Sequence, residues 1–136
     1  MQINPYLAFD GQCKHAFQFY AKCLHGEIVF MMTNGESPMA SQMPPEQHDR
    51  VMHASLKVGE EMLAGADAPP EHYRKPQGFC VSLDIKDPAE AERVFGALSE
   101  NGTVQMPLQE TFWALRFGMF IDQFSIPWMV NCGKPM

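Results

Sequence analysis

Few side chains in this sequence have the chemistry of an active site, and those few are scattered along it. His53 lies near the start of the alternating stretch 50–58 and is a candidate general base or ligand-orienting group, because a neutral imidazole suits either role. Glu110 would be able to move a proton if it were buried. The simpler alternatives are a His53 bonded to a backbone carbonyl and a solvated Glu110. A non-standard metal site formed by His48, His53 and a carboxylate such as Glu110 has no local spacing to support it.

The cysteines offer little metal or nucleophile chemistry. Cys13, Cys23, Cys80 and Cys132 form no CxxC pair, and their spacings match no zinc module. We expect free thiols, mostly buried. Cys80 would need a neighbouring cation to become a reactive thiolate, and its immediate neighbours Phe79 and Val81 provide none.

Large amphipathic side chains suggest binding more than catalysis. Tyr6 and Trp113 would be able to stack a planar or apolar ligand if they line a cleft, although core or interface packing is the alternative for both. The eleven methionines would suit either adaptable core packing or a pocket for varied apolar ligands. The sequence therefore favours a binding site with aromatic and thioether walls.

Composition excludes several partner classes. The 136-residue chain is 46% hydrophobic and 19% charged, with a net charge of −6. Its ten Lys and Arg residues are dispersed, whereas nucleic-acid binding needs a basic patch. No apolar run approaches the roughly 20 residues that span a bilayer, and the N-terminus lacks the features of a signal peptide. We expect a cytoplasmic protein that binds neither nucleic acid nor membrane.

The elements that would position these groups occur twice. A shift of 76 positions pairs Leu7 with Leu83, Phe19 with Phe95, and Gly26 with Gly102. Each half opens with a short strand, continues with an amphipathic helix that stops at a Gly, and ends in extended segments. This repeat predicts an α+β fold of two β-α-β-β-β modules within a single domain, residues 1–136. Module one covers about 1–66, a linker covers 67–77, and module two covers about 78–136.

Hydrophobic periodicity and turn residues give the element boundaries. Gly26 is expected to end the first helix in a left-handed conformation, and Asp87 with Pro88 to begin the second. In the first module we predict strands at 2–9, 27–33, 50–58 and 61–66, and a helix over 13–24. In the second we predict strands at 79–85, 103–108, 112–117, 119–122 and 126–131, and a helix from 88 to about 100.

Residues 34–49 lack periodicity and contain three prolines and a Gly, which predicts a long surface loop. Met39 and Met43 give it two apolar anchors four residues apart. We predict a mobile flap that becomes ordered when a ligand or a partner subunit covers these methionines.

Five segments of the chain resemble one known family. They are Pro5-Tyr6-Leu7-Ala8-Phe9-Asp10-Gly11, Ala16-Phe17-Gln18-Phe19-Tyr20, Met52-His53-Ala54-Ser55-Leu56, Met106-Pro107-Leu108-Gln109-Glu110-Thr111-Phe112-Trp113 and Asp122-Gln123-Phe124-Ser125-Ile126-Pro127-Trp128-Met129-Val130. Together they are similar to the PhnB-like branch of the vicinal oxygen chelate (glyoxalase, bleomycin-resistance and dioxygenase) superfamily. The resemblance covers nearly the whole chain. It implies two β-α-β-β-β modules whose curved mixed sheets enclose a cleft, and a homodimer.

The resemblance does not bring the superfamily's metal site with it. Metal-using members place His, Glu or Gln on the first and fourth strands of the modules, and those positions hold Pro5, about Ala64, Cys80 and Met129 here. Divalent-metal catalysis needs about three N, O or S ligands. The demethylubiquinone methyltransferase label of the branch finds no support either, because Asp10-Gly11-Gln12 is a plain turn and not a Gly-rich methyl-donor loop.

These observations predict a protein that binds a small apolar or planar molecule without cofactor or metal. The candidate cleft-lining residues are Tyr6, His53, Cys80, Glu110, Trp113 and Met129. A lyase, isomerase or dioxygenase with a relocated metal site around His53 is one alternative. A module that serves dimerisation or another interaction alone is the other, and whether the protein is an enzyme stays open.

Overall fold

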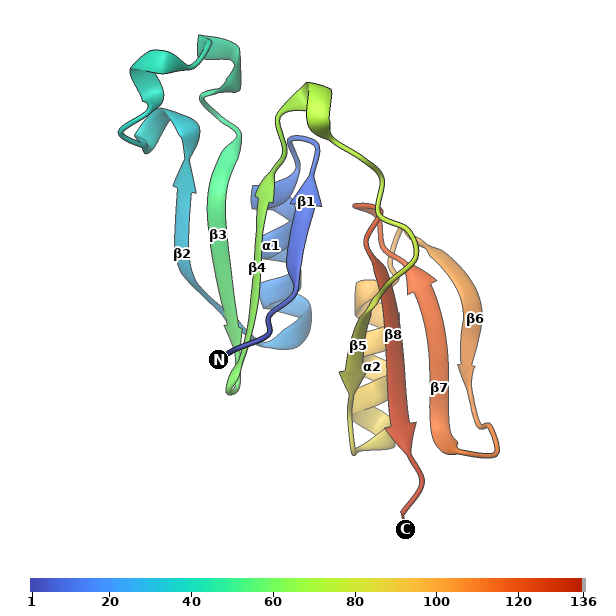
Figure 1. Cartoon of the computed structure of the whole chain (residues 1–136). Coiled ribbons are helices and arrows are strands. Elements are labelled where there is room, and N and C mark those ends of the chain that lie inside the picture. The colour runs from blue at the N-terminus through green and yellow to red at the C-terminus, as the bar shows by residue number, and fades with distance from the viewer. Residues whose placement is uncertain (136) are drawn as a thin grey trace. The chain divides into compact units, whose positions relative to one another are not determined.

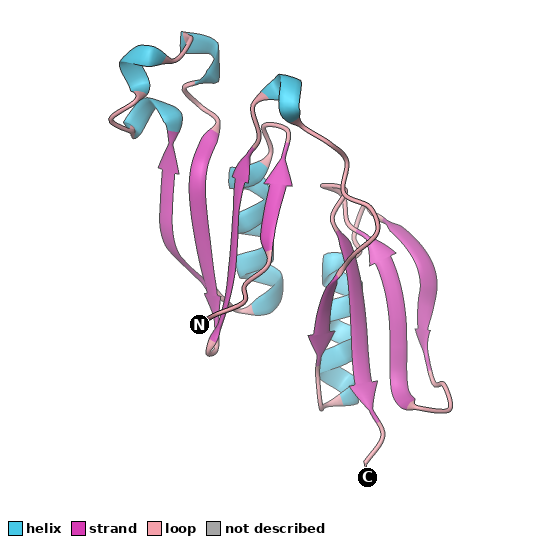
Figure 2. Cartoon of the chain, in the orientation of Figure 1, coloured by secondary structure: helices cyan, strands magenta, loops and turns pink. Residues whose placement is uncertain are grey.

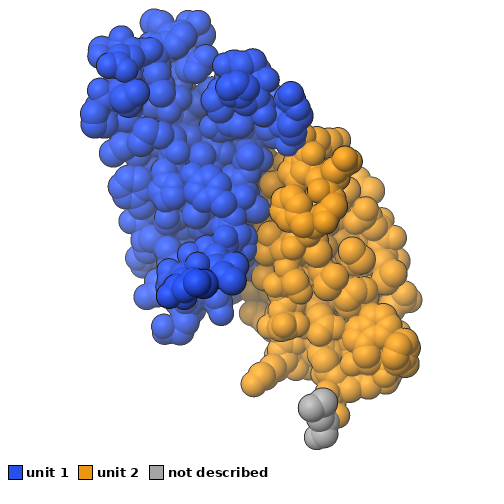
Figure 3. Space-filling view, viewed as in Figure 1, with its two compact units in different colours: residues 1–74 blue, residues 75–136 orange. Residues whose placement is uncertain are grey.

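The computed structural model describes residues 1–135. The chain divides into two compact units, Met1–Arg74 and Lys75–Met136 (Figure 3). Each unit has one four-stranded sheet with one helix packed on one face (Figures 1 and 2). The α+β class and the two similar modules predicted from the repeat are confirmed.

The first unit follows the predicted order of elements. It contains β1 (Tyr6–Phe9), α1 (Cys13–Leu24), β2 (Glu27–Thr33), β3 (Val51–Val58) and β4 (Glu61–Asp67). The sheet order is β1-β4-β3-β2, with β1 parallel to β4 and the other pairs antiparallel. The last strand of the unit therefore lies between the first strand and the third.

The second unit repeats this plan. It contains β5 (Val81–Asp84), α2 (Pro88–Leu98), β6 (Thr103–Gln109), β7 (Ala114–Ile121) and β8 (Pro127–Gly133). Its sheet order is β5-β8-β7-β6, again with one parallel pair, between β5 and β8. The units therefore share one topology, as the sequence repeat predicted.

Each helix buries the stripe that its periodicity predicts. In α1 the buried residues are Cys13, Ala16, Phe17, Tyr20 and Cys23, and in α2 they are Ala91, Val94, Phe95 and Leu98. Phe9 of β1 packs against Phe17, with ring centroids 6.1 Å apart, and Phe95 packs against Phe120 of β7 at 5.0 Å. Burial of such side chains contributes about 1.5–3 kcal/mol each.

Two local predictions are wrong, and a third segment has more local structure than expected. The left-handed residue after α1 is His25, with φ of 54°, and not Gly26. The segments predicted at 112–117 and 119–122 are one strand, β7. The loop at 34–49 is not irregular throughout, because short 3₁₀ turns form at η1 (Asn34–Glu36), η2 (Ala40–Gln42) and η3 (Pro45–Gln47).

Gly26 and Gly102, which the sequence repeat pairs, immediately precede β2 and β6, where two backbones approach closely. A Cβ on Gly26 would lie 2.8 Å from the carbonyl oxygen of Lys57, and one on Gly102 would lie 2.3 Å from that of Ile121. Real Cβ atoms do not approach carbonyl oxygens this closely. Absence of a side chain, rather than a positive φ, is what both positions require.

Candidate functional site

Tyr6, His53 and Ser55 form a hydrogen-bonded chain on the first sheet. The Tyr6 hydroxyl lies 3.1 Å from His53 Nδ1, and His53 Nε2 lies 3.2 Å from Ser55 Oγ. In β1 and β3 these residues alternate with buried ones, including Leu7 and Leu56. The chain therefore lies on the sheet face opposite α1.

The register of the strands explains how Tyr6 reaches His53 across β4. Tyr6, Ala64, Ser55 and Phe30 occupy one row across the four strands. Ala64 carries only a methyl group, so the strand between β1 and β3 leaves space above it. The tyrosine ring lies over this space, with its centroid 5.7 Å from that of His53.

Phe30 completes an aromatic strip around His53. Its ring centroid lies 5.8 Å from the imidazole, on the side of β2. Tyr6 is 56% exposed and Phe30 is 45% exposed, whereas His53 and Ser55 are half-buried. Desolvation raises the pKa of the Tyr6 hydroxyl, with a smaller contribution from Cys13, so this hydroxyl stays protonated at neutral pH. The strip combines exposed ring faces with hydroxyls and an imidazole.

In the second unit, Trp113 and Met129 belong to two different groups of side chains. Met129 pairs in register with Ser82, whose hydroxyl lies 3.7 Å from the Met129 sulfur. Trp113 precedes β7 and packs edge-on against Phe112 and Phe117, with centroids 4.8 and 5.2 Å away. Trp113 is therefore part of an aromatic cluster at the start of β7.

The other predicted residues have structural partners or ordinary surroundings. Glu110 forms an exposed ion pair with Lys134 at 3.2 Å, which fits its interpretation as a solvated carboxylate. Cys80 is a half-buried free thiol just before β5. His48 Nε2 lies 3.0 and 3.2 Å from the carbonyl oxygens of Ala40 and Met43, so this ring braces the loop.

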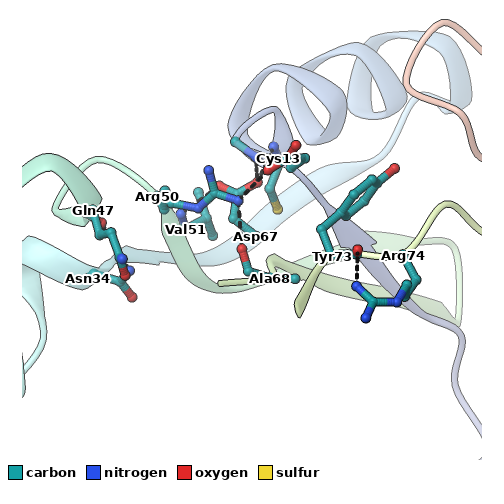
Figure 4. Close-up of polar contacts among 11 residues, drawn as sticks. Cys13, Asn34, Gln47, Arg50, Val51, Asp67, Ala68, Tyr73 and Arg74 are labelled. Atoms are coloured by element: carbon teal, nitrogen blue, oxygen red, sulfur yellow. Dashed lines mark hydrogen bonds and ion pairs between the residues drawn. The ribbon is translucent and has the colours of Figure 1, made fainter. Parts of the chain in front are cut away.

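A separate pocket of about 210 Å³ lies beneath this loop in the first unit. Its lining residues are Asn34, Met43, Gln47, Arg50, Met52, Asp67, Ala68 and Pro69. Arg50 Nη2 donates to Asp10 Oδ1 at 2.9 Å and to the carbonyl oxygen of Ala68 at 2.6 Å, whereas the buried Arg50 Nε has no partner within residues 1–135 (Figure 4). The carboxylate of Asp10 offsets the charge of this guanidinium.

Asp67, at the end of β4, ties three segments together next to this pocket. Its Oδ1 accepts the N–H groups of Gly11 and Cys13 at 2.8 and 3.0 Å, and its Oδ2 accepts that of Val51 at 2.7 Å (Figure 4). The carboxylate thereby caps α1, whose N-cap residue Gln12 makes no side-chain cap. Burial and the charge of Asp67 raise the pKa of the Cys13 thiol to about 12.

Sequence reasoning found two members of the hydrogen-bonded chain and missed the rest of the site. Ser55 was identifiable from its place two residues after His53 on the same strand face. Phe30 and Ala64 become neighbours only through strand register. Asp67 and Arg50 gave no local signal, because their partners lie far away in the sequence.

Comparison with known proteins now places the chain. The profile of the 3-demethylubiquinone-9 3-methyltransferase family matches residues 1–131. The chain belongs to this family. Protein YjdN from Escherichia coli (strain K12) is 33% identical to it, over 98% of this chain and 97% of that protein. The crystal structure of protein PA1353 from Pseudomonas aeruginosa is 46% identical, with a TM-score of 0.91 and 99% of both chains covered.

The fold extends to a more distant protein. A fosfomycin resistance protein, FosX from Listeria monocytogenes, is 8% identical to this chain and superposes with a TM-score of 0.68. The match covers 98% of this chain and 94% of the FosX chain. That likeness shows the fold alone. The predicted family, labelled demethylubiquinone methyltransferase-like, is confirmed by the profile match, and the predicted glyoxalase-like fold by the solved structures.

The residues at the superfamily's metal positions do not fit a divalent ion. Ala64 faces Tyr6 in register, and Met129 faces Ser82. With Pro5 and Cys80, the four positions supply one thiol and one thioether and no imidazole or carboxylate. Within residues 1–135 no three His, Cys, Asp or Glu side chains lie close enough together to hold a metal.

The loop between β1 and α1 does not fit a methyl donor such as S-adenosylmethionine. A Gly-rich loop that held the anionic group of such a donor would use free backbone N–H groups at the start of a helix. Here the N–H groups of Gly11 and Cys13 are both bonded to Asp67. The family description therefore has no counterpart in this loop.

No helix among the described residues has the length and apolar character to cross a membrane.

Proposed function

We propose that this protein binds a small planar or largely apolar molecule on the α1-free face of its first sheet. The observation that carries the proposal is the strip of Tyr6, His53 and Phe30, whose neighbouring ring centroids lie 5.7 and 5.8 Å apart. Exposed ring faces at such spacings suit a flat ligand, because stacking buries apolar area on both partners. Ala64 leaves the space across which the Tyr6 ring reaches His53, and so keeps the rings of the strip side by side.

The proposed binding does not use the superfamily's usual metal site, since the donor atoms at those positions do not suit one. A relocated metal at His53 has little support as well. Both ring nitrogens of His53 already have hydroxyl partners, and a metal ion would have to displace Tyr6 or Ser55.

Ligand-induced stabilisation tests the proposal. A panel of bicyclic aromatic compounds is added to the untagged protein, and the melting temperature is measured with EDTA and without it. A ligand present at 100 times its Kd stabilises by about 2.7 kcal/mol. We expect at least one compound to stabilise the wild type equally in both conditions.

Three variants locate the binding site. His53→Ala should lose the stabilisation, and Ala64→Leu should lose it by displacing the Tyr6 ring that lies across this row. His15→Ala, on the exposed side of α1, should keep it. Stabilisation that survives both His53→Ala and Ala64→Leu would place the ligand elsewhere, and stabilisation abolished by EDTA would favour the metal-dependent alternative.

We also propose a cytoplasmic homodimer. Support for the dimer comes from exposed aromatic side chains in the second unit: Phe112 is 89% exposed, and Trp113, whose ring centroid lies 4.8 Å away, is 46% exposed. Contiguous apolar surface of this kind commonly marks an interface. Four free cysteines suit a reducing compartment. Sedimentation velocity distinguishes a dimer from a monomer.

A further inference from the structure

The hydrogen bonds that join Tyr6, His53 and Ser55 form a chain on the first sheet. The direction of donation along this chain is not fixed. If His53 carries its hydrogen on Nε2, then Tyr6 donates to Nδ1, Nε2 donates to Ser55, and the Ser55 hydrogen is left over. With the hydrogen on Nδ1 every bond reverses, and the Tyr6 hydrogen is left over. A neutral imidazole thus gives the chain one donating end and one accepting end.

We infer that Tyr6, His53 and Ser55 form a reversible hydrogen-bond relay that selects planar ligands carrying a hydrogen-bonding oxygen, either a hydroxyl or a carbonyl. A carbonyl oxygen of the ligand accepts a hydrogen bond from the donating end of the relay. A phenolic hydroxyl of the ligand donates a hydrogen bond to the accepting end. The relay serves both by exchanging the His53 tautomer, without movement of any ring.

Two structural features support a ligand role for this relay. Tyr6 is more than half exposed, so one end of the relay opens to solvent, and Phe30 places an exposed ring beside the imidazole. Each relay member comes from the same sheet face, which fixes their separations through strand register. The inference rests on the proposed function for its ligand site, but the relay itself exists without a ligand.

The relay is tested first in the free protein. Protein with ¹⁵N-labelled histidine is studied by NMR at pH 8, and both His53 ring nitrogens are followed in the wild type, Tyr6→Phe and Ser55→Ala. In a relay, each substitution changes the shifts of both nitrogens, because both bonds depend on one tautomer equilibrium. The other four histidines serve as internal controls. Changes confined to the nitrogen next to the substituted residue would overturn the inference.

The ligand class is tested with three matched probes: 2-naphthol, 2-acetylnaphthalene and 2-methylnaphthalene. One additional hydrogen bond should make the two oxygen-bearing compounds bind about 3- to 10-fold more tightly than the hydrocarbon. The two complexes should show opposite His53 tautomers, and Tyr6→Phe with Ser55→Ala should remove the preference.

The outcomes separate the two proposals. Equal affinity for all three probes would leave the proposed binding function intact and overturn the relay's role in selection. An unchanged His53 tautomer in both complexes would do the same. If none of the three probes, nor any other compound of the panel, binds to the protein, the proposed function itself fails, whatever the free-protein NMR shows.

Discussion

Asp67 and Asp122 are single carboxylates that each accept several N–H groups. Asp67 accepts three backbone N–H groups from two segments of the first unit, two at the start of α1 and one at the start of β3. Asp122 is buried in the second unit, where it accepts the N–H groups of Phe124 and Ile126 and the indole N–H of Trp128 at 2.8 Å. Multiple donors make such a carboxylate costly to replace, because each orphaned N–H loses a partner.

Replacing Asp67 should therefore destabilise the protein strongly. We expect Asp67→Ala to lower the free energy of unfolding by about 2–4 kcal/mol, and Asp67→Asn by about half as much, because an amide retains one acceptor oxygen. Urea denaturation followed by circular dichroism measures both. Asp49→Asn, an exposed carboxyl on the loop, is the matched control and should change stability by less than about 0.5 kcal/mol. Equal effects of Asp67→Asn and Asp49→Asn would contradict the structural role of the carboxylate.

Cys13 should make the protein less stable in alkali. Its folded pKa of about 12 lies above the value of about 8.5 for a free thiol, so the unfolded state loses this proton first. The contribution of the buried, protonated Cys13 thiol to the free energy of unfolding is complete below about pH 8.5. It falls by up to about 1.4 kcal/mol per pH unit between that pH and about pH 12. Comparing wild type with Cys13→Ala from pH 8 to 10.5 isolates the effect. The stability difference between them should shrink as pH rises, and a constant difference would refute the elevated pKa.

Adding a side chain should have opposite effects at Gly102 and at Gly96. A Cβ at Gly102 would clash with the carbonyl oxygen of Ile121, whereas nothing lies within 4 Å of a Cβ built at Gly96 in α2. We expect Gly102→Ala to destabilise by about 2–4 kcal/mol and Gly96→Ala to stabilise by about 0.5–1 kcal/mol. Thermal and urea unfolding of the two variants test the opposite signs. A stabilising Gly102→Ala would show that β6 does not approach β7 this closely.

The loop at 34–49 remains a predicted flap. Its turns are single 3₁₀ bonds, such as Ser37 N–H to the carbonyl oxygen of Asn34, and the His48 ring braces it. We expect amides 36–47 to exchange hydrogen faster than those of β3 in the free protein, and more slowly when a ligand or partner covers Met39 and Met43. His48→Ala should accelerate exchange further, and His72→Ala is the control. Protection equal to that of β3 in both states would make the loop a fixed element.

Element types could be predicted from the sequence where one periodicity dominated. Both helices and the strand at 27–33 follow directly from their apolar spacing, and Asp87 caps α2 as expected by accepting from the Ala89 N–H. The strands predicted at 112–117 and 119–122 left out Gly118, which lies within β7. Its missing side chain makes room for the Phe95 ring of α2, whose Cε2 would lie 2.6 Å from a Cβ. The local sequence does not show whether such a glycine interrupts a strand or makes room for a tertiary contact.

For the molecule as a whole, the repeat was the strongest predictor, and the unequal loops were the weakest. Residues 34–50 join β2 to β3 in the first unit, whereas residues 110–113 join β6 to β7 in the second. Both the pocket and the aromatic strip lie in the unit with the longer connection. Their residues meet only through strand register, which a single sequence does not specify when two strands are separated by such a loop.

Dimerisation should depend on the exposed ring of Phe112. Phe112→Ser removes apolar surface without a core contact, because the side chain is 89% exposed. We expect a shift from dimer to monomer by sedimentation velocity, with a Kd increase of at least about tenfold. Val29→Ser, a 46% exposed residue of β2, is the matched control. A dimer unaffected by Phe112→Ser but broken by Val29→Ser would move the interface to the first unit.

The parallel edge strands also set an order of events during translation. Tyr6 of β1 pairs with Ala64 of β4, 58 positions later, whereas Val81 of β5 pairs with Trp128 of β8, 47 positions later. During synthesis β1, with Leu7 and Phe9, therefore waits longer for its parallel neighbour than β5 does. The nascent first half carries an open, apolar strand edge over this interval. Chaperone demand and aggregation during expression should thus come first from the first half, even though the two folded units share one topology.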